Sequence, residues 1–170
     1  MAGRVVIIDT GILCVWLRVP GKETCGTKGD IWDYGRAEQE IRDAIKQNST
    51  LVLPLATILE TGNHIAQAPE HRLEKAKALA ALILKAAQAE SPWAAFTQQS
   101  ELWSPVHLQT LAREWPDYAQ TRLSIGDATI KAVADYYTQM GMQVRLLTAD
   151  KQLSAHEPRV VLPVPRRRRT

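Results

Sequence analysis

The chain has 170 residues and a mass of 19.0 kDa, which is enough to bury a core within one domain without disulfide or metal support. Its apolar content of 45% and its five Trp exclude a disordered or low-complexity chain. The net charge of +3 is smaller than the four positive charges of Arg166–Arg169 alone, so the rest of the chain is not basic. We therefore predict one domain over residues 1–163 and a flexible basic tail over residues 164–170.

The apolar stretches of the sequence are too short for a membrane span. The longest, residues 78–89, contains Lys85, and Val5–Ile8 runs into an acidic residue where a signal peptide needs a longer apolar core. Cys14 and Cys25 have neither zinc-site nor CxxC spacing, so we expect buried or idle thiols. These features predict a cytoplasmic protein without membrane contacts.

The hydrophobic pattern alternates between strand-like and helix-like segments. Strands are predicted at residues 4–8, 51–53, 144–147 and 159–162, and helices at 12–17, 37–47, 54–69, 71–89, 106–114 and 124–139. Leu59 and Ile125 are expected on the inward faces of their helices. The polar, Gly-rich stretch 18–33 is predicted to be a mobile loop, and 91–118 is assigned no further than its one helix. This order predicts an α/β fold with a central, mostly parallel β-sheet flanked by helices.

Four acidic residues stand at related places in this pattern. Asp9 and Asp150 each follow a predicted strand, and ligands bind beyond the carboxyl ends of strands in open parallel sheets. Glu60 lies two turns into the helix after the second strand, and Asp127 lies in the first turn of the helix before residues 144–147. The four carboxylates would therefore meet at one edge of the sheet. Their oxygens are the ligands that Mg²⁺ and Mn²⁺ prefer.

Helix capping is an alternative role for three of these acids. Asp9 and Asp150 stand where an N-cap is expected, and Asp127 completes a capping box with Ser124. Glu60, inside a helix and beside its apolar stripe, gains nothing from the helix dipole. Capping accounts for each acid separately but gives no reason for all four to gather, and both interpretations stay open.

Four blocks of the sequence carry these acids: VVIIDTGIL (5–13), LPLATILETGNHI (53–65), LSIGDATIKAVAD (123–135) and VRLLTADKQL (144–153). They resemble the four signature segments of PIN-domain ribonucleases, in particular the VapC-type toxins of prokaryotic toxin–antitoxin pairs. The resemblance implies a PIN fold, metal-dependent hydrolysis of RNA, and Mg²⁺ or Mn²⁺ as cofactor. It also implies a cognate antitoxin and a homodimer as partners.

By this resemblance the acidic quartet falls on Asp9, Glu60, Asp127 and Asp150, with Thr10 and Thr148 as accompanying hydroxyls. We expect Asp9 and Asp127 to bind the main ion directly. Glu60 and Asp150 are expected to bind it through water or to hold a second ion. Thr148 is expected to orient Asp150 or a water, unless it is an inert residue at the end of a strand.

The sequence departs from the family pattern at Gly11, where Ser or Asn is common, and in the insertions 18–33 and 91–118. These departures bear on the substrate and the partners and leave the four acids untouched. A catalytically silent PIN-fold binding module and a PIN-type nuclease outside toxin–antitoxin systems remain as alternatives. An aspartyl phosphatase is disfavoured, because Gly11 stands where its second acid is needed.

Four further residues have two interpretations each. His64 is either a ligand or proton donor, or merely hydrogen-bonded at the surface. Lys131 and Lys151 either meet flanking phosphates or are solvated. Trp16 either stacks on a base or fills the core.

Overall fold

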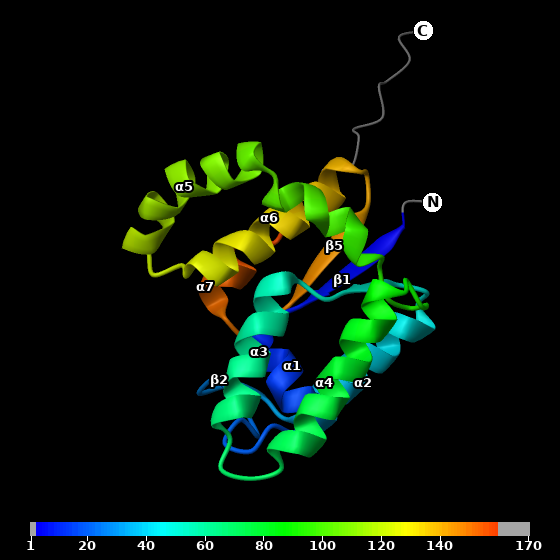
Figure 1. Ribbon diagram of the computed structural model, residues 1–170. Coiled ribbons are helices and arrows are strands. Elements are labelled where there is room, and N and C mark those ends of the chain that lie inside the picture. Colours follow the sequence, from blue (N-terminus) through cyan, green and yellow to red (C-terminus); the bar gives the residue numbers. More distant parts are fainter. Residues whose placement is uncertain (1–2, 160–170) are drawn as a thin grey trace, which may run out of the picture.

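A computed structural model describes residues 3–159 of the chain. Its centre is a three-stranded parallel sheet in the order β4-β1-β5, formed by Thr50–Val52, Arg4–Ile8 and Gln143–Leu147 (Figure 1). β1 pairs with both neighbours, Ile7 lying opposite Val52 on one side and Leu146 on the other. The predicted α/β class and parallel sheet are confirmed. Of the strand predicted at 159–162, all but Arg159 lies outside the described residues, as do residues 164–170.

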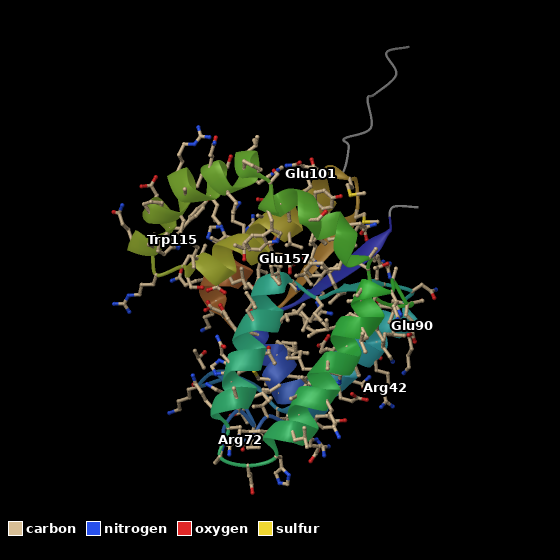
Figure 2. All side chains as sticks on the ribbon, in the orientation of Figure 1. Arg42, Arg72, Glu90, Glu101, Trp115 and Glu157 are labelled. Carbon is tan, nitrogen blue, oxygen red and sulfur yellow. The ribbon has the colours of Figure 1, made fainter. Side chains whose placement is uncertain are left out.

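Helices cover both faces of the sheet (Figure 1). Their bounds are α1 Thr10–Trp16, α2 Tyr34–Lys46, α3 Leu55–Gln67, α4 Arg72–Ala87, the 3₁₀ helix η1 Phe96–Trp103, α5 Pro105–Gln120, α6 Ile125–Gln139 and α7 Lys151–Ser154. Charged side chains such as those of Arg42 on α2 and Glu90, which follows α4, lie exposed on the outside (Figure 2). Among residues 3–159, no helix is long and apolar enough to cross a membrane.

The core divides at β1, whose residues alternate between two apolar clusters as the period of a strand requires. Val6 and Ile8 belong to the cluster shared with α1, α2 and α4. Val5 and Ile7 belong to the cluster shared with α6. All four side chains are buried, so β1 has no solvated face, in agreement with its uninterrupted apolar run.

The prediction that 18–33 is an irregular loop was wrong. This segment contains an antiparallel hairpin of β2, Cys25–Thr27, and β3, Asp30–Trp32. Its strands are too short to show alternation in the sequence, and tertiary contacts hold them. Trp32 is buried in the core, and the guanidinium of Arg36 stacks on its ring, 3.9 Å from the centroid.

Three further expectations are corrected. The helix predicted at 106–114 is α5, which extends to Gln120 and contains Pro116. Leu59 and Ile125, expected to face inward, are 58% and 50% exposed. Ile125 is the first residue of α6, at the exposed start of the helix. The segment 92–94 follows the edge of β4, with Ala94 N–H donating to Leu51 O at 2.8 Å.

Candidate functional site

Asp9 lies between β1 and α1. Its Oδ1 accepts a hydrogen bond from the Thr10 N–H at 2.6 Å, and its Oδ2 accepts one from the Thr148 hydroxyl at 2.7 Å. The side chain is therefore an N-cap, as one interpretation predicted. Thr148, which directly follows β5, also holds this side chain in place. This double attachment orients a carboxylate that is only 8% exposed.

The surroundings of Asp9 disfavour its negative charge. The pKa of its carboxyl is raised from 3.8 to about 6, mainly by burial; the hydrogen bonds from Thr148 and Thr10 lower the pKa, and the charges of Asp127 and Glu60 contribute to the rise. A nearby cation would stabilise the charged form of this carboxylate. The pocket is thus electrostatically strained without one.

Glu60 reaches the same place from α3. Its Oε2 accepts a hydrogen bond from the Thr10 hydroxyl at 2.9 Å. Its Oε1 lies so close to the second residue of α6, Gly126, that a Cβ at this position would overlap it. The absence of a side chain at Gly126 is what lets α6 approach this carboxylate.

Asp127 lies in the first turn of α6. Its N–H donates to Ser124 Oγ at 3.0 Å, and the Ser124 hydroxyl donates to Asp127 Oδ2 at 2.8 Å, which completes the predicted cap. Burial raises the pKa of the Asp127 carboxyl, the Ser124 hydrogen bond opposes this, and the charges of Asp150 and Glu60 add to the rise. Capping and clustering therefore occur together.

Asp150 follows β5 and caps α7. Its Oδ1 accepts hydrogen bonds from the N–H groups of Gln152 and Leu153 at 2.6 and 3.3 Å. Its own N–H donates to the Thr148 hydroxyl at 3.0 Å. Thr148 therefore orients the Asp9 side chain and the Asp150 backbone, whereas the sequence predicted a role toward Asp150 or a water.

The four carboxylates line a single open pocket of about 510 Å³ at the carboxyl edge of the sheet, which we call the acidic pocket. The expected gathering of Asp9, Glu60, Asp127 and Asp150 is thus present in the geometry, and their chemical role stays a prediction. Lys151 lies at the same pocket, as one of its interpretations requires.

Their donor set fits a hard divalent cation, since every candidate ligand is a carboxylate oxygen. Within residues 3–159, however, no three His, Cys, Asp or Glu side chains stand close enough together to hold one metal ion. Glu60 and Asp127 are turned to the hydroxyls of Thr10 and Ser124 instead. Holding an ion would require a change of side-chain rotamer, such as the exchange of one of these hydrogen bonds for the cation.

The hairpin supplies pocket residues that sequence reasoning missed, namely Cys25, Gly26 and Thr27. Cys25 Sγ lies 3.4 Å from the position that a Cβ would take at Gly11, so the hairpin covers the start of α1. No sequence motif predicts this contact. Both cysteines are free thiols, as expected, and burial raises the pKa of each to about 11.

The remaining candidates lie elsewhere. Lys131 donates to Asp135 at 2.6 Å and does not line the acidic pocket. Trp16 packs 6.5 Å from the ring of Trp93 and donates to Glu38 at 2.7 Å, which favours the core interpretation. His64 is partly buried outside the pocket lining. Its pKa is lowered by burial and by the charge of Lys22.

Comparison with protein-family models, curated proteins and solved structures finds no match for this chain.

Proposed function

We propose that this chain is a PIN-type, metal-dependent endoribonuclease and the toxin of a toxin–antitoxin pair. The single observation that supports it most is the acidic pocket, in which four carboxylates from four separate elements meet at the carboxyl edge of the sheet. The four blocks that resemble PIN-domain ribonucleases carry these same acids. The preference for RNA over DNA rests on that resemblance alone.

Asp9 and Asp127 would hold Mg²⁺ or Mn²⁺ directly, and Glu60 and Asp150 would hold it through water or bind a second ion. The bound ion would supply Lewis-acid stabilisation of charge on the phosphodiester. Thr148 holds the Asp9 carboxylate in place from the neighbouring strand. Lys151 would bind a flanking phosphate of the RNA.

A silent binding module with this fold is the main alternative. Such a module has no use for a buried carboxylate whose pKa is raised to about 6, mainly by burial and also by the charges of Asp127 and Glu60. A nuclease outside toxin–antitoxin systems would keep the same acidic pocket and differ only in its partner. The toxin assignment therefore depends on the resemblance, and a cytoplasmic location belongs to the same proposal.

The proposed antitoxin would cover the acidic pocket and lay a helix along Leu73–Ile83 of α4. This face and α3 border a groove with predominantly apolar walls, and Leu73 is 70% exposed. A homodimer is the other proposed partner. Light scattering of the purified chain tests for the dimer, and co-purification with the product of a neighbouring gene tests for the antitoxin.

The deciding experiment incubates the purified chain with assorted RNAs and DNAs in Mg²⁺, in Mn²⁺ and in chelator. Cleavage of RNA is expected only with a divalent ion, and Asp127→Asn should lower its rate by at least about a hundredfold, because the developing charge loses its ligand-held cation. Asp117→Asn, an exposed aspartate of α5, is the matched control. Cleavage by Asp127→Asn at the control rate would contradict the proposal.

A further inference from the structure

Two large aliphatic side chains are exposed next to the residues of the acidic pocket. Leu59 is 58% exposed on α3 and directly precedes Glu60. Ile125 is 50% exposed at the start of α6, two residues before Asp127. The sequence pattern predicts an inward orientation for both, so their exposure beside two of the four acids calls for a reason.

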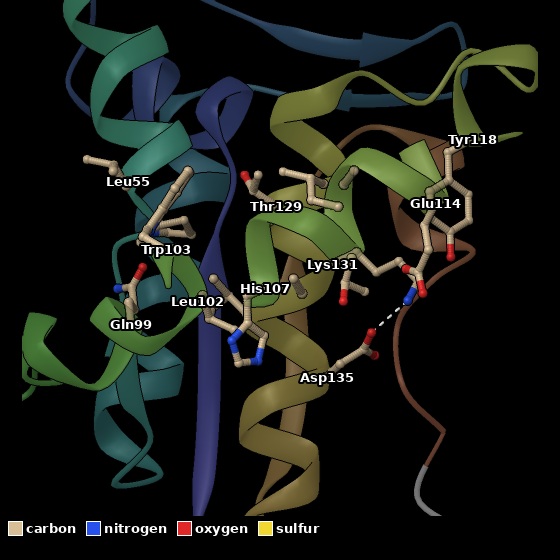
Figure 3. A pocket seen from close by; sticks show the side chains of 16 residues that line it. Leu55, Gln99, Leu102, Trp103, His107, Glu114, Tyr118, Thr129, Lys131 and Asp135 are labelled. Carbon is tan, nitrogen blue, oxygen red and sulfur yellow. Dashed lines mark hydrogen bonds and ion pairs between the residues drawn. The ribbon is translucent and has the colours of Figure 1, made fainter. Parts of the chain in front are cut away.

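The packing of α3 against α6 brings these two side chains to one part of the surface. The Glu60 carboxylate lies against the second residue of α6, so the turn of α3 that carries Leu59 meets the start of α6. Leu55, one turn before Leu59, lines a small cavity between η1, α5 and α6 (Figure 3). Thr129, one turn after Ile125, lines the same cavity. Residues four apart share a helix face, so Leu59 and Ile125 are the exposed continuation of two facing sides, and we call the pair the Leu59–Ile125 platform.

The Leu59–Ile125 platform is continuous with the acidic pocket. Glu60, Ser124 and Asp127, which flank the platform in the sequence, all line that pocket. The platform residues themselves are not part of the lining, and their side chains offer no ligand to a cation. A phosphodiester bound in the acidic pocket carries a base only one sugar away from the phosphate. The platform is therefore placed to contact such a base.

The size of the Leu59–Ile125 platform favours a nucleobase over a protein as its partner. A specific protein interface takes about 800 Å² from each partner, and two side chains supply only a fraction of that area. An unpaired base is flat and packs one face on a small apolar surface. Because Leu and Ile carry no hydrogen-bonding groups, this contact does not read the edge of the base and tolerates all four bases.

We propose that the Leu59–Ile125 platform packs against the face of an unpaired base next to the phosphodiester that the acidic pocket holds. This inference rests on the proposed nuclease function and adds to it two side chains that bind the RNA. Leu59 and Ile125 take no part in the chemistry. Their contact with the base is made before the reaction and is kept during it, so it acts on the affinity for the RNA.

The test uses an unstructured RNA with a mapped cleavage site and two copies of it, each with an abasic ribonucleotide on one side of the scissile phosphate. On one abasic RNA, the wild type should lose about fivefold or more in kcat/KM, mainly through KM, as the loss of a small apolar contact predicts. Leu59→Ser and Ile125→Ser should show a similar loss on the intact RNA and no further loss on that abasic RNA. Leu84→Ser, 59% exposed on α4, and Ile45→Ser, 43% exposed on α2, are the controls and should behave like the wild type.

Three results would overturn the proposal. The first is unchanged cleavage of the intact RNA by both platform variants. The second is an abasic loss as large in Leu59→Ser as in the wild type, because the two effects would then be independent. The third is unchanged cleavage together with weaker binding of a protein partner by Leu59→Ser, which would make the platform a protein interface.

A failure of the nuclease function itself is distinguishable from these results. If the wild type cleaves no RNA in Mg²⁺ or Mn²⁺, the proposed function is contradicted, and the platform is then tested by fluorescence anisotropy of the labelled intact RNA in Mg²⁺. Weaker binding by Leu59→Ser than by Leu84→Ser would support the base contact. Equal affinities of these two variants, or no binding by the wild type, would overturn it.

Discussion

The acidic pocket and a smaller cavity between η1, α5 and α6, which Gln99 lines, share one helix and differ in their charge. α6 contributes Asp127 to the first and residues between Ala128 and Asp135 to the second. In the acidic pocket, hydroxyls and N–H groups already donate to the carboxylates, and the surplus is negative charge. In the smaller cavity (Figure 3), Lys131 is paired with Asp135, Glu114 is a further carboxylate, and the walls are mainly apolar. The first site therefore favours a cation, whereas the second is shaped mainly by apolar packing.

If the acidic pocket is strained by its own charge, neutralising Asp9 should stabilise the protein. The pKa of Asp9 is about 6 in the folded state and about 3.8 in the unfolded chain, so between these pH values the folded state keeps a proton that the unfolded state loses. The contribution of Asp9 to stability therefore falls as pH rises from about 4 to about 6. At pH 7, Asp9→Asn should raise the free energy of unfolding by at most about 3 kcal/mol, at about 1.4 kcal/mol per pKa unit.

Urea denaturation of the wild type and Asp9→Asn at several pH values between 4 and 7 measures this difference. The two stabilities should converge toward pH 4 and separate toward pH 7. Asp117→Asn, exposed on α5, serves as the control and should follow the wild type. Curves that stay parallel over the whole range would show that Asp9 carries no such strain.

A divalent cation should relieve the same strain by binding the folded state alone. At a concentration a hundred times its Kd, Mg²⁺ or Mn²⁺ would add about 2.7 kcal/mol to the free energy of unfolding. The thermal midpoint should rise accordingly, and the rise should be smaller in Asp127→Asn. No shift at millimolar Mg²⁺ or Mn²⁺ would leave the four carboxylates without their proposed cofactor.

Substitutions at Gly126 and Gly62 form a matched pair that tests whether the Glu60 carboxylate must lie close to the start of α6. Gly126→Ala would push the Glu60 carboxylate away, since the new Cβ overlaps Oε1, and RNA cleavage should fall about tenfold. At Gly62, on α3, the nearest atom to a new Cβ is Leu79 Cδ2 at 3.9 Å, so Gly62→Ala should keep the activity. Equal rates of RNA cleavage by the two variants would show that the position of the Glu60 carboxylate does not matter for catalysis.

The smallest expected effect concerns Cys25, because the reactivity of its thiol depends on the negative charge of the acidic pocket. Burial and then the charge of Asp9 raise the pKa of its thiol to about 11, so iodoacetamide should modify it slowly at pH 8. Asp9→Asn should speed this modification a few-fold, as measured by mass spectrometry of the peptide. The buried Cys14 is the internal comparison. An unchanged rate at Cys25 would mean that Asp9 does not act on the hairpin.

Elements with long apolar runs or strong periodicity were predicted closely from the sequence. β1 was predicted at its observed bounds, and β5 and α6 within one residue, because their burial follows from local patterns. The acids at the ends of β1 and β5 were predictable for the same reason, since topology places strand ends together. The hairpin and η1 were missed because their short segments are held by contacts with distant residues.

The order of apolar and polar residues along this chain was sufficient to predict a parallel α/β sheet and the four acids at its edge, because periodicity and strand ends are local properties. The choice of polar partners was not predictable in this way. That Thr148 bonds to Asp9, that Thr10 bonds to Glu60, and that one oxygen of Gln99 is left unpaired follow from the packing of segments far apart in the chain. Hydrogen bonds act over about 3 Å, and only the folded chain brings such groups within that distance.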